Sequence, residues 1–233
     1  MFKTIGIFAH VDGGKTTFSE QLLYKNGSIR NLGRVDNQTA FLDCDNIEKE
    51  RGITVRSSLV SFDAEGTKVQ LIDTPGHVDF SAEVERAINV LDGAVLAVSG
   101  VEGIEAQTYT IWNALKEKKV PTIFFINKMD RDGADYEAVL KELKEKLEVP
   151  VISLEKVEKK GKEVIVSKLS KDEIIEQLSS VESGVDDIIE SYLEDPSSIS
   201  NEKLNKRIEE LSQKGIINIV IGGSALKSIG TKE

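Results

Sequence analysis

Residues 9–16 read AHVDGGKT, and this stretch decides the fold. It departs from the phosphate-binding pattern GxxxxGK[ST] only by having Ala9 at the first position. An apolar run at residues 2–9 precedes the stretch, and apolar side chains recur at helical spacing over residues 17–24. Strand, glycine-rich loop and helix in this order are the context that the pattern requires. The sequence therefore predicts a phosphate-binding loop (P-loop).

The P-loop carries the residue types that hold a phosphate group and its metal. Gly13 and Gly14 let backbone amides approach phosphate oxygens. Lys15 is expected to reach the β and γ phosphates of a nucleotide, and the Thr16 hydroxyl to bind Mg²⁺. We place the adjoining Thr17 with the nucleotide-binding residues. A glycine-rich turn with a solvated lysine is the alternative.

A second motif, DTPGH at residues 73–77, follows the strand-like residues 68–72. Asp73 would emerge at the carboxyl end of that strand, which is the edge where ligands of wound sheets bind. A carboxylate there can hold Mg²⁺, and the Gly76 amide can approach the γ phosphate. Because Asp-Thr-Pro-Gly also favours a turn, a purely structural role is the alternative.

The third motif, NKMD at residues 127–130, follows the apolar run 121–126 and predicts guanine recognition. The Asp130 carboxylate can accept hydrogen bonds from guanine N1 and N2, whereas adenine offers no such pair of donors. ATP would leave that charge unpaired. Residues 224–226 are expected to supply a backbone amide to guanine O6. The predicted base-binding set is Asn127, Lys128, Asp130, Ser224, Ala225 and Leu226.

Apolar runs that alternate with helical segments predict an α/β fold with a mostly parallel wound sheet and helices on both faces. Residues 55–62 and 68–72 flank Glu65 and Gly66 and indicate a hairpin. Residues 94–98, 121–126 and 216–221 suit buried strands. The spacing of five apolar side chains predicts an amphipathic helix at Tyr136, Val139, Leu140, Leu143 and Leu147.

Residues 149–214 are rich in lysine and glutamate and predict a small α+β insertion before the last strand. It should contain a hairpin turning at Lys160 and Gly161, a helix with a Ser170/Glu173 capping box, and a last helix with Leu204, Ile208 and Leu211 on one face. We expect a final covering helix and further domains to lie outside the chain. The predicted division is a P-loop core at 1–148, the insertion at 149–214, and the last strand with its base-recognition loop at 215–233.

Composition excludes several classes of protein. The net charge of −10 argues against a broad basic surface for nucleic acid, so DNA binding is not expected and any RNA contact must be local. Cys44 is the single cysteine, so the chain can form no internal disulfide. No apolar run approaches the roughly 20 residues of a membrane span. We expect a cytoplasmic monomer away from membranes.

The motifs AHVDGGKTT, RGIT, DTPGH, NKMD and GSAL, in this order, resemble the GTPase domain of translation factors, particularly elongation factor G and its relatives. The stretches SIRNLG, at residues 28–33, and DTPGHVDFSAEVERA are most similar to tetracycline-resistance ribosomal protection proteins. The resemblance implies a P-loop GTPase fold and an enzyme of antibiotic resistance that hydrolyses GTP to GDP and phosphate on the ribosome, with Mg²⁺. The alternatives are elongation factor G or another close relative, and a non-hydrolysing GTP-dependent interaction switch.

The same resemblance implies roles for single residues. Thr54 of RGIT would coordinate Mg²⁺ and the γ phosphate, and His77 would position the attacking water with local help from ribosomal RNA. Asp12 would lie near the phosphates. Lys15 would stabilise charge on the transferred phosphoryl group. His10 is expected to support the loop instead of reacting.

Overall fold

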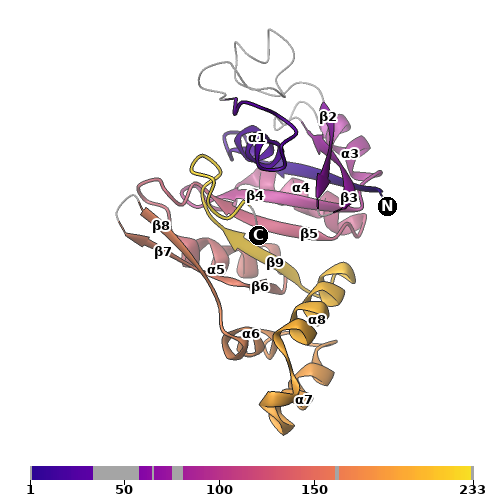
Figure 1. The fold of residues 1–233 in the computed structure, drawn as a ribbon, viewed down its shortest axis with the longest axis vertical. Helices are drawn as coiled ribbons and strands as arrows, with labels where there is room; N and C mark the ends of the chain where they lie inside the picture. The colour runs from indigo at the N-terminus through magenta and orange to yellow at the C-terminus, as the bar shows by residue number, and fades with distance from the viewer. Residues whose placement is uncertain (1, 34–57, 65, 75–80, 161–162, 232–233) are drawn as a thin grey trace.

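The computed structural model describes residues 2–33, 58–64, 66–74, 81–160 and 163–231 (Figure 1). A seven-stranded sheet runs through it in the order β2-β3-β1-β4-β5-β9-β6. Every described neighbouring pair in this sheet is parallel except β2 with β3. Its strands are β1 (Phe2–Ala9), β2 (Ser58–Ala64), β3 (Thr67–Asp73), β4 (Gly93–Ser99), β5 (Thr122–Asn127), β6 (Val151–Ser153) and β9 (Asn218–Gly222).

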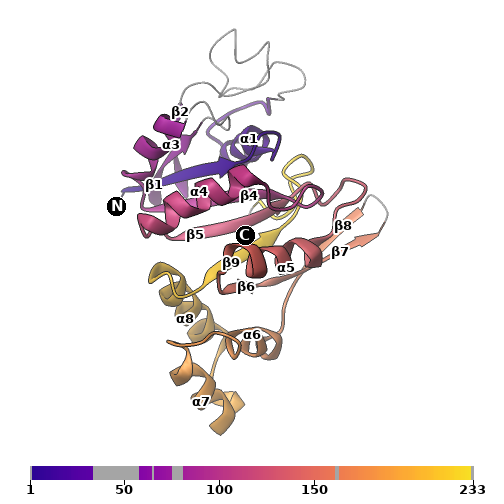
Figure 2. The same ribbon diagram turned by 180° about the vertical axis from the view of Figure 1, so that it is seen from behind.

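Helices cover both faces of this sheet, as the sequence predicted. Figure 2 shows α4 and α5 in front of the strands, and Figure 1 shows the same strands from the opposite side. Two separate apolar clusters lie on the two faces, one containing side chains of α3, α4 and α5 and the other containing side chains of α1. These helices are α1 (Lys15–Lys25), α3 (Ser81–Ile88), α4 (Ala106–Glu117) and α5 (Tyr136–Leu147).

Consecutive residues of the central strands explain why their sequence is apolar without alternation. Leu96 and Phe124 enter the cluster under α4 and α5, whereas the next residues along each strand, Ala97 and Phe125, enter the cluster under α1. Successive side chains of a strand point to opposite faces, so a strand covered on both sides needs apolar residues at every position. Phe18 of α1 packs on Phe125 with ring centroids 4.7 Å apart.

Residues 151–222 contain a hairpin and three α-helices outside the main sheet, and also two strands of that sheet, β6 and β9. The antiparallel hairpin of β7 (Glu155–Lys160) and β8 (Glu163–Lys168) confirms the predicted hairpin, although Gly161 lies outside the described residues. The Ser170 capping box with Glu173 is present. Residues 151–153, which the sequence analysis assigned to the insertion, form β6 at the edge of the main sheet beside β9. The helices are α6 (Lys171–Leu178), α7 (Asp186–Glu194), the 3₁₀ turn η3 (Pro196–Ser198) and α8 (Asn201–Gln213).

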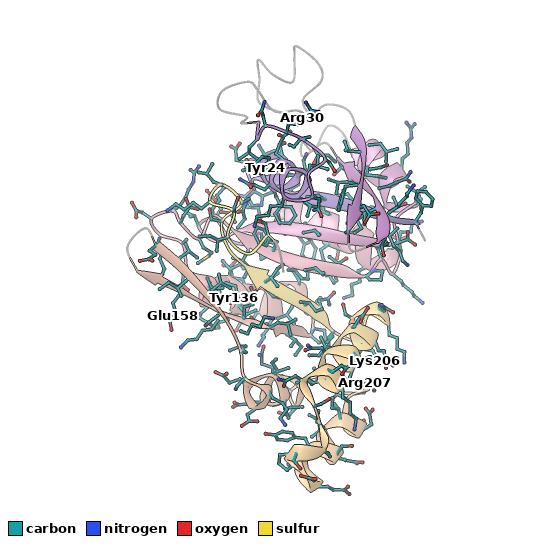
Figure 3. All side chains as sticks on the ribbon, viewed as in Figure 1. Tyr24, Arg30, Tyr136, Glu158, Lys206 and Arg207 are labelled. Atoms are coloured by element: carbon teal, nitrogen blue, oxygen red, sulfur yellow. The ribbon has the colours of Figure 1, made fainter. Side chains whose placement is uncertain are left out.

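The helices α6 to α8 form a third apolar cluster of their own, at the end of the molecule beyond β6 and β9 (Figure 1). The predicted face of α8, with Leu204, Ile208 and Leu211, is buried in it. Arg207 of α8 donates to Asp187 Oδ1 at 2.7 Å and to the Gly184 carbonyl at 3.0 Å, which joins α8 to the start of α7 (Figure 3). Among the described residues, no helix is long and apolar enough to cross a membrane.

Replacement of Leu178 by alanine should lower the free energy of unfolding by about 2–5 kcal/mol, because this buried side chain would leave a cavity in the third cluster. Urea unfolding followed by far-UV circular dichroism measures the loss. Leu193→Ala is the matched control, since that side chain is 76% exposed and Leu178 is 0% exposed. Equal and small effects of the two substitutions would contradict the assignment of Leu178 to a packed core.

Candidate nucleotide-binding site

The predicted site residues that the structure describes gather where β1, β3, β5 and β9 end. In parallel strands these carboxyl ends share one edge of the sheet, which is why motifs far apart in the sequence meet there. The P-loop connects β1 to α1, and Gly14 precedes the first helical residue with φ of 85°. A Cβ atom at Gly14 would collide with the Asn127 side-chain amide. Glycine is therefore required here both by conformation and by space.

A buried ion pair joins the P-loop to the end of β3. Lys15 Nζ lies 2.7 Å from Asp73 Oδ2, and the two side chains are 7% and 0% exposed. The other carboxylate oxygen, Oδ1, accepts a hydrogen bond from the Ser19 hydroxyl at 2.9 Å. Removing one partner from such a pair leaves a buried charge uncompensated, so the two residues are strongly coupled. The structure thus brings together Lys15, which is predicted to bind phosphate, and Asp73, which is predicted to bind Mg²⁺.

The Asn127 carboxamide connects three loops. Its Nδ2 donates to the Gly13 carbonyl at 2.9 Å, and its Oδ1 accepts from the Ala225 amide at 2.9 Å. One side chain therefore ties the P-loop and the loop after β9 to the NKMD motif. The backbone adds to this arrangement, since the Met129 amide donates to the Gly223 carbonyl at 3.0 Å.

The remaining base-recognition residues lie beside this junction. Ser224 and Ala225 are buried, and their amides donate to Ile229 O and to Asn127 Oδ1. Within the part of the chain that is described, no such bond engages the Leu226 amide. Asp130 is partly exposed. Lys128 has φ of 61°, a left-handed conformation that is uncommon for a residue with a side chain.

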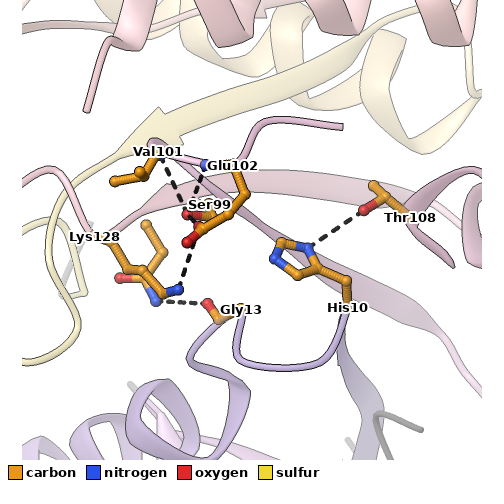
Figure 4. A network of polar contacts seen from close by, with 8 residues as sticks. His10, Gly13, Ser99, Val101, Glu102, Thr108 and Lys128 are labelled. Carbon is orange, nitrogen blue, oxygen red and sulfur yellow. Dashed lines mark hydrogen bonds and ion pairs between the residues drawn. The ribbon is translucent and has the colours of Figure 1, made fainter. Parts of the chain in front are cut away.

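His10 is a buried P-loop residue that contacts α4, which agrees with its expected role of supporting the loop. Its Nδ1 lies 3.4 Å from the Thr108 hydroxyl of α4 (Figure 4). The Val11 amide donates to Gln107 Oε1 at 3.1 Å. Burial lowers the pKa of the His10 imidazole, so the ring is neutral at neutral pH. The start of α4 therefore holds two consecutive P-loop residues in place.

The other predicted residues divide into two groups. Asp12 is exposed with φ of 62°, and Thr16 and Thr17 are partly exposed at the start of α1. Thr54, Gly76 and His77 lie outside the described residues. Among those described, no cluster of three His, Cys, Asp or Glu residues could hold a metal by itself.

Sequence analysis missed the segment from the end of β4 to the first turn of α4 as part of this site. Glu102 contacts Lys128 directly, and Ser99 contacts Lys128 through Glu102. Gln107 and Thr108 contact the P-loop. These residues match no nucleotide-binding pattern. The only feature of the sequence that could have indicated their role is their position. They follow a buried parallel strand, so they lie at the same edge of the sheet as the motifs.

Comparison with known proteins gives relatives over most of the chain. The tetracycline resistance protein TetO of Campylobacter jejuni is 44% identical over 230 residues, which cover 98% of this chain and 35% of TetO. TetP of Clostridium perfringens is 41% identical, with the same two shares of coverage. TetM from transposon Tn916 of Enterococcus faecalis is 46% identical over 189 residues, which cover 81% of this chain and 29% of TetM. The predicted resemblance to tetracycline-resistance proteins is confirmed, and the chain spans about a third of the length of these relatives.

A crystal structure of the protein ttk003000868 from Thermus thermophilus superposes with a TM-score of 0.84 at 27% sequence identity. The superposition covers 99% of this chain and 38% of that protein, and it confirms the predicted fold class. A family model, the elongation factor Tu GTP-binding domain, matches residues 2–233. The chain therefore belongs to the family of elongation factor Tu GTP-binding domains.

Proposed function

We propose that this chain is the nucleotide-binding domain of a tetracycline-resistance ribosomal protection protein, and that it hydrolyses GTP to GDP and phosphate on the ribosome. The observation that carries the proposal is the junction at Asn127, whose side chain joins the P-loop to both base-recognition loops. A single ligand that has phosphates at one end and guanine at the other would contact all three segments. The similarity to TetO and TetM favours a protection protein over elongation factor G.

Guanine recognition rests on Asp130 and the loop after β9. The carboxylate would accept from N1 and N2 of the base, and a backbone amide of Ser224, Ala225 or Leu226 would donate to O6. Leu226 fits this role best, because the other two amides already donate within the protein. Adenine would leave the Asp130 charge without a hydrogen-bond partner. Selectivity for guanine would therefore come from the free-energy cost of binding adenine.

Magnesium fits the oxygen donors at the phosphate end of the site. Asp73 and Thr16 supply a carboxylate and a hydroxyl, and Mg²⁺ in nucleotide sites uses few protein oxygens together with substrate phosphates. Thr54 would add a third oxygen. The bound ion would neutralise charge on the β and γ phosphates. Lys15, held on Asp73 in the structure, would turn to the phosphates and stabilise the same charge.

Hydrolysis would proceed by in-line attack of water on the γ phosphate, with His77 positioning the water and the Gly76 amide facing the phosphate. Asp12, Gly13, Gly14 and Thr17 would complete the phosphate-binding loop. The expected activator is the ribosome through local contact with its RNA. We also propose that the protein acts in the cytoplasm as a monomer, away from DNA and membranes. The insertion predicted at residues 149–214, apart from β6 at 151–153, would lie between the core at 1–148 and the segment at 215–233.

Asp130→Asn should weaken GTP binding by about 2–3 kcal/mol, or roughly 30- to 150-fold, because hydrogen bonds to a charged acceptor are lost. The same variant should gain affinity for xanthosine triphosphate, since the C2 carbonyl of xanthine can accept from the new amide. Competition with a fluorescent GDP analogue measures both affinities. Asp132→Asn, an exposed aspartate two residues away, is the control and should bind GTP normally. Unaltered GTP affinity in Asp130→Asn would refute the base assignment.

His77→Ala should bind GTP as tightly as the unmodified chain and lose roughly 10²- to 10⁴-fold of the ribosome-stimulated rate, because the water would no longer be positioned. Single-turnover release of phosphate from pre-bound GTP, with and without ribosomes, gives the rate. Full stimulation in the variant would remove His77 from its role. An unmodified protein that retains GTP intact on ribosomes would favour the non-hydrolysing switch.

A further inference from the structure

We propose that Glu102 is a positioning residue for guanine nucleotide binding, acting through the Lys128 ammonium of the NKMD motif. The inference rests on the proposed function, because it assigns a task to a residue beside the proposed base site. Glu102 lies in the loop between β4 and α4, and Lys128 follows β5 (Figure 4). These two strands are neighbours in the sheet, so their ends bring the two side chains together.

The contact itself is a partly buried ion pair supported by a hydroxyl. Lys128 Nζ lies 3.3 Å from Glu102 Oε2, and the side chains are 13% and 41% exposed. The same carboxylate oxygen accepts a hydrogen bond from the hydroxyl of Ser99, which is fully buried. Burial alone would raise the pKa of the Glu102 carboxyl, but the Ser99 hydroxyl and the Lys128 charge together lower it. Glu102 is therefore an anion at neutral pH.

The loop that carries Glu102 is fixed on both sides of that residue, before it to the base-recognition segment and after it to α5. The Gly100 amide donates to the Asn127 carbonyl at 2.7 Å, and the Asp135 amide donates to the Gly100 carbonyl at 2.9 Å. On the other side of Glu102, the Ile104 amide donates to Glu142 Oε2 of α5 at 2.9 Å. Glu102 is thus held in place relative to the residues on both sides of Lys128. A residue that positions a neighbouring side chain must itself be held in this way.

The chemistry of the NKMD loop explains why Lys128 needs this partner. A lysine side chain that is only 13% exposed requires an anion close by, and Asp130 stands only two residues away. An ion pair between Lys128 and Asp130 would occupy the carboxylate that should accept from guanine N1 and N2. Glu102 supplies a separate anion and leaves Asp130 available to the base. It also fixes the direction of the long Lys128 side chain, whose backbone is in the left-handed region.

The test is a double-mutant cycle on the 233-residue chain, with equilibrium constants for GDP and GTP measured by displacement of a fluorescent GDP analogue. The variants are Glu102→Gln, Lys128→Met and their combination. Glu117→Gln removes the same charge from an exposed residue at the opposite end of α4, and it serves as the control. Thermal unfolding of every variant reports on the integrity of the fold.

Glu102→Gln should weaken binding of GDP and GTP by the same factor, roughly 3- to 10-fold, because the two nucleotides share one base. In the Lys128→Met background the same substitution should change affinity by less than about 1.5-fold, since the group on which Glu102 acts is gone. Glu117→Gln should bind like the unmodified chain.

Two results would overturn the inference while the proposed function stands. One is saturable guanine nucleotide binding that Glu102→Gln leaves unchanged. The other is an equal loss of affinity with and without the Lys128 side chain, which would mean that Glu102 acts on the fold or on another residue. Absence of any saturable binding by the unmodified, folded chain would instead defeat the proposed function.

Discussion

The hydrogen bonds of the Asn127 side chain are the constraint on which the arrangement of the site depends. Its amide nitrogen holds the Gly13 carbonyl of the P-loop, and its oxygen holds the Ala225 amide after β9. Strand order alone brings the loops to one sheet edge but does not fix their spacing. The Asn127 side chain fixes the spacing, because it is short and buried and carries a donor and an acceptor at fixed geometry. Its position also explains why there is no room for a side chain at residue 14.

Around this junction, charged side chains are arranged as ion pairs. Lys15 and Asp73 neutralise each other in a nearly dry site, and such a pair contributes little to stability compared with apolar side chains of the same size. Its value lies in having a cation and an anion ready at the place where phosphate and metal would arrive. Lys128 and Glu102 form a second, more exposed pair at the base end. Charges are therefore prepared at both ends of the proposed ligand.

Much of the fold could be predicted because buried strands and amphipathic helices leave plain patterns. The runs at residues 94–98, 121–126 and 216–221 are apolar at most positions, since both faces of these strands are covered. Strand β6 could not be foreseen, because three residues are too few to show a period. The described motif residues are adjacent, as expected, whereas Glu102 and Ser99 escaped notice because their role depends on tertiary contact with Lys128. The role of Gly76 remains a prediction from the DTPGH motif, and the roles of Thr54 and His77 remain predictions from the resemblance.

The central claim is that three separate segments bind one guanine nucleotide, and amide hydrogen exchange of the unmodified chain with and without GDP and Mg²⁺ tests it most directly. The account predicts that GDP slows exchange in residues 10–16, 127–130 and 223–226 together, with the same concentration dependence, and that ADP does so in none of them. Slowing confined to residues 10–16, or equal slowing by ADP, would contradict it.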